Sequence, residues 1–368
     1  MKASQKVRFA VVGLGHIAQI AVLPAFENAR EKCELTAFIS DDPEKIEKLS
    51  KKYGVSNSWS YSEYEEALNS KKFDAVYIAL PNDMHKDFAI KAAKAGIHVL
   101  CEKPMALDAD ECEAMLKQAE KSGIKLMIAY RLHFEKANMT AVDMIKSGKI
   151  GDPRVFNTSF SLQVREGNIR TQSEHGGGPL MDIGIYCINA SRYIFQDEPT
   201  EVLAFSAQSS DPRFAEIEES VSAVMKFPGE RLAAFTCSFG AEAMGRYEVL
   251  GTKGLLTLDP AYEYADELQL KVKSGEEEQT MKLSKHDHFA PELLHFAECI
   301  LEDKQPQPTG HEGLNDLRII DAIRESIKTG RSAKIKTDPE VKKPGKDLIT
   351  EKPGGEKPEL INVQSGSR

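Results

Sequence analysis

Residues 7–18, VRFAVVGLGHIA, form an apolar run of strand length that ends abruptly in a glycine turn. The pattern from Gly13 to Ala18, G-x-G-x-x-A, is typical of a dinucleotide-binding turn between a strand and a helix. Gly13 permits the tight turn, Gly15 lets backbone N–H groups approach a pyrophosphate, and Ala18 allows close helix packing. A glycine turn without a ligand has the same pattern, so the assignment depends on whether strands and helices alternate after it.

They alternate as far as residue 130. Strands are predicted at residues 34–39, 73–80, 98–101 and 125–129, and helices at 43–53, 63–68, 85–95 and 109–122. This predicts an α/β fold whose N-terminal domain, residues 1–130, is a doubly wound parallel Rossmann sheet of about six strands. Ligands bind beyond the carboxyl ends of such strands, which places the predicted nucleotide contacts on one rim: Gly13, Gly15, His16, Ile17, Ser40, Leu80, Pro81, Asn82, Glu102 and Lys103.

Beyond residue 131 many segments alternate apolar with polar residues, as in a sheet with one covered face. Strands are predicted at 154–163, 201–206, 220–227, 233–239, 246–250, 255–258 and 267–273, and helices at 136–147, 289–301 and 311–329. We expect residues 131–336 to form an α+β substrate and oligomerisation domain with a large open, mostly antiparallel sheet. Its free face predicts a homodimer or homotetramer. Residues 337–368, rich in Lys, Glu, Pro and Gly, are expected to be a mobile polar tail.

Composition limits the classes of partner. The 368 residues, 41% hydrophobic and 29% charged, suit two globular domains. A net charge of −9 without a basic stripe argues against nucleic acid, and no apolar run is long enough to cross a bilayer. The start carries no signal-peptide pattern and the six cysteines form no C-x-x-C, so we expect a cytoplasmic protein with reduced thiols. His286-Asp287-His288 lacks a third ligand at helical or hairpin spacing, so no metal is expected.

The end of the second strand decides between NAD and NADP. Ser40 and Lys45 suit a 2′-phosphate, whereas Asp41 and Asp42 would suit unmodified ribose hydroxyls. Asp42-Pro43 also has the pattern of an N-cap followed by proline at the first helical position. We therefore expect the two acids to act mainly in capping and the cofactor to be NADP, with NAD the less favoured alternative.

Three residues could carry alcohol oxidation. Asp182 and Tyr186 follow the glycine-rich segment 176–178 at i, i+4 spacing, which puts them on one face of a helix, and Lys103 lies on the strand rim. Tyr186 could take the hydroxyl proton if Lys103 lowers its pKa, while Asp182 orients the substrate or joins the proton relay. Spacing alone also allows an N-cap, an ordinary helix tyrosine and a solvated lysine.

The motifs settle this choice by resemblance. GLGHIA at 13–18, LPNDMH at 80–85, EKP at 102–104, YRLHFE at 130–135 and GGGPLMDIGIY at 176–186 resemble the glucose-fructose oxidoreductase, inositol dehydrogenase and MocA family. The likeness extends to about residue 336. It implies that Lys103 is a catalytic and substrate-binding lysine, Asp182 the acid of the last motif and Tyr186 the proton acceptor or donor. Inositol-dehydrogenase-like members carry histidine at this last position, so the chain is more similar to the glucose-fructose oxidoreductase branch, which favours NADP.

The same resemblance implies an NAD(P)-dependent oxidoreductase that transfers hydride between nicotinamide C4 and a cyclic sugar, an aldose or a related polyol. Arg131 would meet cofactor or substrate, or form a salt bridge between domains. His85 would touch the nicotinamide side or cap a helix, and His288 would contact the sugar. Alternatives are a dihydrodiol or anhydrosugar dehydrogenase or reductase, and a non-catalytic NADP sensor. Whether the cofactor is captive or exchangeable stays open.

Overall fold

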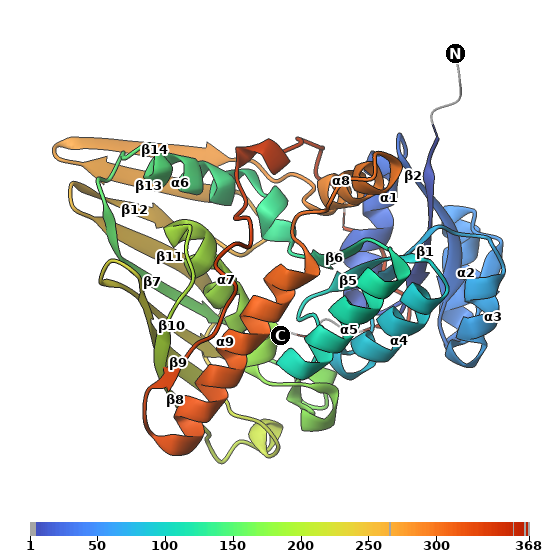
Figure 1. The fold of residues 1–368 in the computed structure, drawn as a ribbon, viewed down its shortest axis with the longest axis horizontal. Coiled ribbons are helices and arrows are strands. Elements are labelled where there is room, and N and C mark those ends of the chain that lie inside the picture. The colour runs from blue at the N-terminus through green and yellow to red at the C-terminus, as the bar shows by residue number, and fades with distance from the viewer. Residues whose placement is uncertain (1–4, 265, 356, 364–365, 367–368) are drawn as a thin grey trace.

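The first domain is built on a six-stranded parallel sheet (Figure 1). A computed structural model of the chain describes residues 5–264, 266–355, 357–363 and 366. The strands of this first sheet are β1 (Val7–Val12), β2 (Cys33–Ile39), β3 (Asn57–Trp59), β4 (Ala75–Ile78), β5 (His98–Glu102) and β6 (Leu126–Ala129). Their order β3-β2-β1-β4-β5-β6 reverses direction between β1 and β4, and ligands of open α/β sheets bind at such a reversal.

Helices cover both faces of this sheet because its strands are apolar on both sides. Phe9 and Val11 of β1 enter one apolar cluster, whereas Ala10 and Val12 enter the other. The helices of this region are α1 (Leu23–Ala29), preceded by the π-helix η1 (Ala18–Val22), α2 (Pro43–Tyr53), α3 (Tyr64–Asn69), preceded by the 3₁₀-helix η2 (Tyr61–Glu63), α4 (Asn82–Lys94) and α5 (Ala109–Ser122). Asp42 caps α2 by accepting from the Lys45 N–H at 3.0 Å. The predicted capping role of Asp42 is therefore confirmed.

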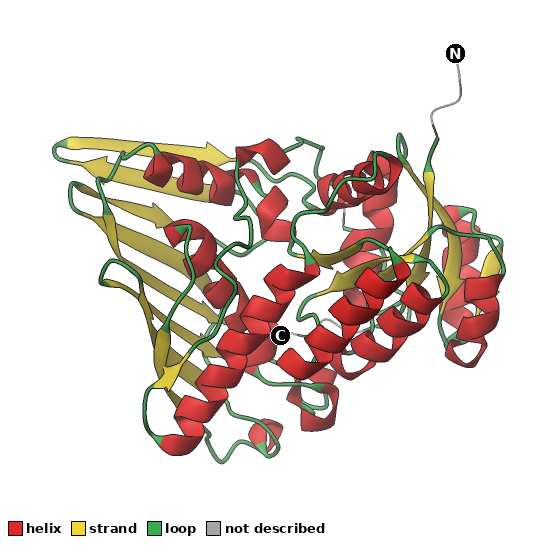
Figure 2. Ribbon diagram, in the orientation of Figure 1, coloured by secondary structure: helices red, strands yellow, loops and turns green. Residues whose placement is uncertain are grey.

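The second domain holds a nine-stranded sheet with helices on one face (Figure 2). Its strands are β7 (Pro153–Ser161), β8 (Glu201–Ala207), β9 (Ser220–Phe227), β10 (Arg231–Ser238), β11 (Met244–Gly251), β12 (Gly254–Leu258), β13 (Leu268–Ser274), β14 (Glu277–Leu283) and β15 (Ala333–Lys334). They follow the order β14-β13-β12-β11-β7-β10-β9-β8-β15, and β7 pairs with β10 in parallel, while the other described pairs are antiparallel. The predicted fold class is therefore confirmed.

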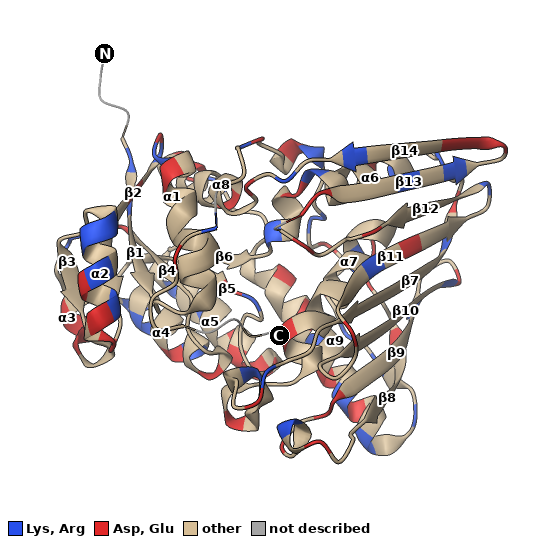
Figure 3. Ribbon diagram, turned by 180° about the vertical axis from the view of Figure 1, so that it is seen from behind, with Lys and Arg blue, Asp and Glu red and all other residues tan. Residues whose placement is uncertain are grey.

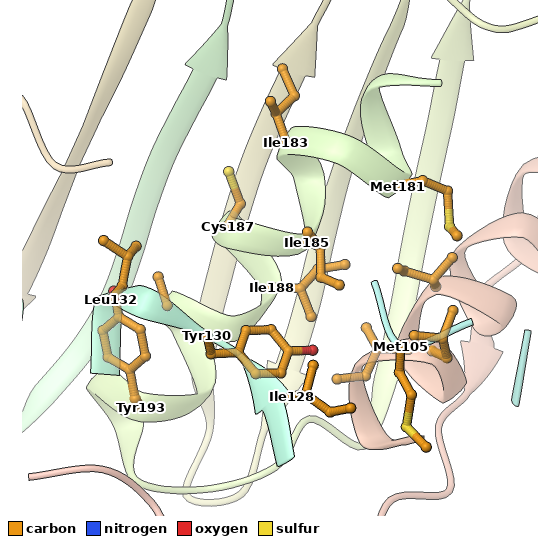
Figure 4. Packing of buried hydrophobic residues seen from close by; sticks show 14 of the residues in the cluster. Met105, Ile128, Tyr130, Leu132, Met181, Ile183, Ile185, Cys187, Ile188 and Tyr193 are labelled. Atoms are coloured by element: carbon orange, nitrogen blue, oxygen red, sulfur yellow. The ribbon is translucent and has the colours of Figure 1, made fainter. Parts of the chain in front are cut away.

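The remaining helices follow β6 in the chain. They are η3 (Arg131–Phe134), α6 (Lys136–Lys146), η4 (Ile169–Thr171), η5 (Ser173–His175), the π-helix η6 (Leu180–Gly184), α7 (Ile185–Phe195), η7 (Pro212–Phe214), α8 (Phe289–Leu301), α9 (Gly310–Thr329) and η8 (Lys346–Leu348). Helix α8 packs on α1, β1 and β2, and α9 packs on α5 and β8. Side chains from both regions, such as Ile128 and Ile188, meet in one buried cluster (Figure 4). Where the chain divides into domains stays a prediction.

The sequence analysis missed three strands, β3, β14 and the two-residue β15. β3 has three residues, and β14, EEQTMKL, has no apolar alternation because it pairs only with β13 at the sheet edge.

Acidic and basic residues are interspersed along the ribbon (Figure 3). Among the described helices, none combines the length and the hydropathy that a membrane crossing requires.

Several described residues of the tail contact the rest of the protein, and its mobility stays a prediction. Leu348 is buried, Lys346 pairs with Asp143 at 2.6 Å, and Lys343 pairs with the buried Glu198. Low apolar content predicted mobility because it leaves little to bury. Here charged side chains anchor the tail to partners on the body of the protein.

Candidate active site

The turn after β1 has the geometry that its glycines predicted. Gly13 has φ +92°, and a Cβ there would lie 2.5 Å from the carbonyl oxygen of Ala79, so the turn packs directly against the end of β4. Nothing lies within 4 Å of the place where a Cβ of Gly15 would stand. Gly15, His16 and Ile17 line a cleft that residues of both domains enclose. The turn therefore leaves room for a ligand at its second glycine.

The cleft has a volume of about 3000 Å³, including space open to solvent. Eleven of the predicted site residues line it: Gly15, His16, Ile17, Leu80, Pro81, Asn82, Glu102, Lys103, Arg131, Asp182 and Tyr186. The amide of Asn82 donates to the Gly176 carbonyl at 2.9 Å, so the glycine-rich segment is docked on the strand rim. A Cβ at Gly176 would meet the Leu107 side chain at 2.4 Å. This glycine is needed for packing between the two domains.

Lys103 and Asp182 form an ion pair at the centre of the cleft. The Lys103 ammonium donates to the Asp182 backbone carbonyl at 2.8 Å and lies 3.3 Å from its Oδ1. Arg170 donates from Nε to Asp182 Oδ2 at 2.7 Å. Burial alone would raise the pKa of Asp182, but the two cations outweigh it and hold that pKa at about 2. Asp182 is therefore a carboxylate at neutral pH and has no proton to give.

Tyr186 lies under two cations at the first turn of α7. The Lys103 ammonium is 4.7 Å and the Arg131 guanidinium carbon 5.1 Å from the centroid of its ring. Phe160 packs edge-on against the ring at 5.6 Å between centroids. Cations over an aromatic face are attracted to it, and a nearby positive charge stabilises a phenolate. The phenol is thus positioned between the strand rim and the helix of the second domain.

A pair of acids lies behind this cluster. Glu102 Oε1 accepts from the Tyr77 hydroxyl at 2.7 Å, and burial raises the pKa of Glu102. Glu292 of α8 is fully buried, and neither carboxyl oxygen has a hydrogen-bond partner among the described residues. Burial, followed by the charge of Glu102, raises the pKa of Glu292 well above its usual range. Glu292 is therefore held as a neutral acid below the rim.

The adenosine end of the predicted site lies outside the cleft lining. Ser40 is buried, and its Oγ accepts from the Asp42 N–H at 3.3 Å. Asp41 accepts from the Tyr61 N–H at 2.7 Å, so both acids have structural partners. The Lys45 ammonium lies 3.4 Å from Asp42 Oδ2. It would have to leave this ion pair to bind a 2′-phosphate.

Two of the predicted site residues, His85 and His288, are not among the residues that line the cleft. His85 is fully buried, and its ring nitrogens lie 2.9 Å from the carbonyl oxygens of Pro104 and Leu80. His288 is buried beside Arg131, with 3.4 Å between its Nδ1 and the guanidinium. The chain segments that the two histidine rings support also cover them. The position of these histidines in the sequence gave no indication of this burial. His85 holds the two rim segments together, and His288 supports Arg131.

Arg131 also has a clear environment. It is buried, lines the cleft and donates to the Tyr262 carbonyl at 2.5 Å. This contact joins the rim to the second domain through a carbonyl rather than through the salt bridge that the sequence left open.

The sequence analysis found no third ligand beside His286 and His288, and the structure corrects this. Glu135 Oε1 lies 3.8 Å from His286 Nε2, and the three side chains gather their ligand atoms within 4.8 Å. Each already faces an N–H group: Glu135 accepts from the first turn of α6, His286 from Lys136, and His288 faces Arg131. The cluster thus serves to cap α6 and to support the arginine.

Comparison with known proteins agrees with this geometry. An oxidoreductase family with an NAD-binding Rossmann fold matches residues 7–130, and its C-terminal alpha/beta domain matches residues 142–336. A D-xylose 1-dehydrogenase [NADP(+)] of Haloarcula marismortui is 32% identical over 89% of this chain and 93% of its own length. A 1,5-anhydro-D-fructose reductase of Ensifer adhaerens is 27% identical over 90% of this chain and 99% of its own.

One solved structure is similar to this chain in both fold and sequence. The aldose-aldose oxidoreductase of Caulobacter crescentus, crystallised with glycerol, superimposes with a TM-score of 0.86 and 34% identity, covering 90% of this chain and all of that one. A Rossmann sheet whose rim lysine faces an aspartate and a tyrosine of a second domain fits a two-domain oxidoreductase. The chain belongs to the Gfo/Idh/MocA oxidoreductase family.

Sequence reasoning missed two residues of the cleft, Arg170 and Tyr264, and the buried Glu292 behind it. Arg170 lies in the polar loop before the glycines, and Tyr264 lies after β12, with the Arg131 guanidinium 5.2 Å from its ring centroid. Glu292 is one of the few acids of an apolar helix, and that position was the signal available for it. Nothing in the spacing of Arg170 pointed to Asp182.

Proposed function

We propose that this chain is an NADP-preferring oxidoreductase that acts on a CH–OH group of a cyclic sugar or related polyol. The observation that carries the proposal is the grouping of Lys103, Asp182 and Tyr186 in a cleft that begins at Gly15. The D-xylose dehydrogenase and the aldose-aldose oxidoreductase described above act on sugars, and the former uses NADP. The rate at which the protein releases NADPH will distinguish a captive nucleotide from an exchangeable one.

The residues present fit a dinucleotide. Open space at Gly15 would admit a pyrophosphate to the backbone of the turn, and Leu80, Pro81 and Glu102 would line its path to the cluster. Ser40 and Lys45 would hold the 2′-phosphate once the Lys45 ammonium leaves Asp42, while Asp42 still caps α2 and Asp41 accepts from the Tyr61 N–H. When bound, the nicotinamide supplies the partner for the hydride that an alcohol loses on oxidation to a carbonyl.

The chain's own groups would manage the proton. Tyr186 takes the proton of the substrate hydroxyl, and Lys103 stabilises the phenolate and donates to the same hydroxyl. Asp182, fixed as a carboxylate between Arg170 and Lys103, orients the lysine and accepts from a second sugar hydroxyl. Arg131 over the Tyr186 ring would add a further donor for a hydroxylated substrate.

Two other functions stay as alternatives. Reduction of an anhydrosugar, as the name of the Ensifer reductase states for that protein, or oxidation of a dihydrodiol would use the same three residues. A non-catalytic NADP sensor would need the nucleotide site alone. The sensor has no use for a lysine, a carboxylate and a phenol joined by direct contacts, which favours an enzyme.

The test is the variant Tyr186→Phe, which removes only the phenol oxygen. We expect turnover of aldoses, beginning with D-xylose, to fall at least about 100-fold, because general acid-base catalysis contributes about that much or more. Binding of NADPH should be unchanged. Tyr53→Phe, on α2 and far from the cleft, is the matched control and should keep wild-type turnover. Wild-type turnover by the Tyr186 variant would refute the proton role.

The free face of the second sheet supports a homo-oligomer. Six large apolar side chains are exposed on β8 to β11: Leu203, Phe205, Val224, Leu232, Met244 and Leu250. Phe205 is 66% exposed, which is unusual for a phenylalanine on a monomer. We expect a dimer or tetramer by sedimentation and a smaller species for Phe205→Ser. A monomeric wild type at all concentrations would refute this.

We place the protein in the cytoplasm. Its six cysteines, Cys33, Cys101, Cys112, Cys187, Cys237 and Cys299, are all buried and unpaired in disulfides, as expected where thiols stay reduced.

A further inference from the structure

The end of the chain crosses the nucleotide-binding side of the first domain. Val363 and Gly366 line the cleft, and the Gly366 carbonyl accepts from the Arg165 N–H at 3.2 Å. In Figures 1 and 3 the C-terminus lies between the two sheets, seen from front and back. Asn362 has φ +49°, a left-handed conformation that asparagine tolerates, so the chain turns there toward the cleft. The described tail therefore borders the same space as the fingerprint turn.

One buried side chain fastens the tail to that turn. Gln19 is 2% exposed and donates from Nε2 to the Leu14 carbonyl and to the Ile361 carbonyl, at 2.9 Å each. Its Oε1 accepts from the Ile361 N–H at 2.7 Å. A buried amide that is hydrogen-bonded to all of these partners fixes their positions relative to one another. Gln19 thus joins the backbone of the fingerprint turn to the backbone of the tail.

The tail also brings polar groups to both ends of the predicted dinucleotide site. Burial lowers the pKa of His16 in the fingerprint turn, and the positive charges of Arg170 and Lys357 lower it further. The Asn362 amide donates to Glu44 Oε2 at 2.6 Å, in the first turn of α2. Asn362 therefore lies beside the helix that begins at the predicted 2′-phosphate end.

We propose that the C-terminal segment, with Lys357, Ile361 and Asn362, is part of the nucleotide site and slows release of a bound phosphorylated dinucleotide. The proposal rests on the proposed function. The Gln19–Ile361 bonds keep the segment against the fingerprint turn, where Val363 lines the cleft. We expect a bound nucleotide to leave more slowly while these bonds are closed.

The experiment measures NADPH release from the full chain by stopped-flow fluorescence. Ile361→Pro removes the N–H that Gln19 accepts, and we expect release to be at least tenfold faster. Lys357→Gln should weaken NADPH binding several-fold and reduce its dependence on salt, since one positive charge that acts on His16 of the fingerprint turn is lost. Lys352→Gln is the matched control: this tail lysine pairs with Glu31 at 3.3 Å, away from the cleft, and should leave release unchanged.

The outcomes separate the two proposals. Unchanged release in both test variants would overturn the role of the tail while leaving the proposed function in place. Tighter NADPH binding by Ile361→Pro would also overturn it, because the tail would then compete with the nucleotide for space. A wild type that binds neither NADPH nor NADH would refute the proposed function together with this inference. Should Ile361→Pro fold poorly, Lys357→Gln alone decides.

Discussion

Replacing Arg170 tests the electrostatic reading of the cleft, because this arginine is the larger of the two cationic influences on Asp182. The carboxylate has a pKa of about 2. Against an ordinary value of about 3.9, the shift corresponds to a stabilisation on the order of 2 kcal/mol at neutral pH. Arg170→Gln should remove about half of it or more, so we expect the free energy of unfolding to fall by about 1–2 kcal/mol at pH 7.

The pH dependence distinguishes this cause from lost packing. A depressed carboxyl pKa stabilises the folded state above the unfolded pKa, and this stabilisation disappears as pH falls through the folded pKa. The difference between wild type and Arg170→Gln should therefore be full above about pH 5 and shrink toward pH 2. Urea unfolding at several pH values measures it.

A matched control and a double variant sharpen the test. Arg154→Gln removes an arginine that is 3.7 Å from Asp152 in a largely exposed pair, and should change stability by less than about 0.5 kcal/mol. In an Asp182→Asn background, Arg170→Gln should cost much less than in wild type, because its partner charge is gone. A difference that does not change with pH, or costs that simply add, would refute the reasoning.

Four further variants probe the fold around the site. Gly13→Ala should lower the unfolding free energy in urea by about 1–3 kcal/mol, since its Cβ would strike the Ala79 carbonyl, whereas Gly15→Ala should leave stability unchanged and weaken NADPH binding. Arg192→Met should destabilise by about 3–5 kcal/mol in thermal unfolding, because it leaves buried carboxylates without their cation. Glu292→Gln should stabilise the protein, with a gain that is absent at pH 4 and grows by about 1.4 kcal/mol per unit as pH rises toward the raised pKa.

The sequence allowed the first domain to be predicted nearly element by element, because its strands are continuous apolar runs and its helices carry local caps. Helix α2 matches its predicted bounds, since Asp42 and Pro43 begin it and Gly54 ends it in a left-handed conformation. Strand β14 could not be predicted, because its order comes from hydrogen bonds to β13 and not from buried side chains.

The site residues likewise divide into those that sequence motifs predicted and those that they did not. Lys103, Asp182 and Tyr186 follow from short motifs, and the structure brings them into contact. Arg170 reaches Asp182 only because its loop is folded back, with Gly177 so close that a Cβ would lie 2.5 Å from the Arg170 carbonyl oxygen. Such a long-range contact leaves no periodic signal in the chain. The ion pairs and the side-chain amide hydrogen bonds that hold the tail likewise leave no signal in the amino-acid composition.

The geometry also assigns different tasks to the three central groups. Burial would lower the pKa of Lys103, but the charges of Tyr186 and Asp182 raise it above its usual value, so the amine is an ammonium at neutral pH. Two of its three N–H groups point to Asp182, one to the carbonyl and one to Oδ1, which leaves one for a ligand. With Asp182 fixed as a carboxylate and Lys103 fixed as a cation, neither changes protonation near neutral pH. We therefore propose that the phenol of Tyr186 is the group of the three that exchanges a proton with the substrate.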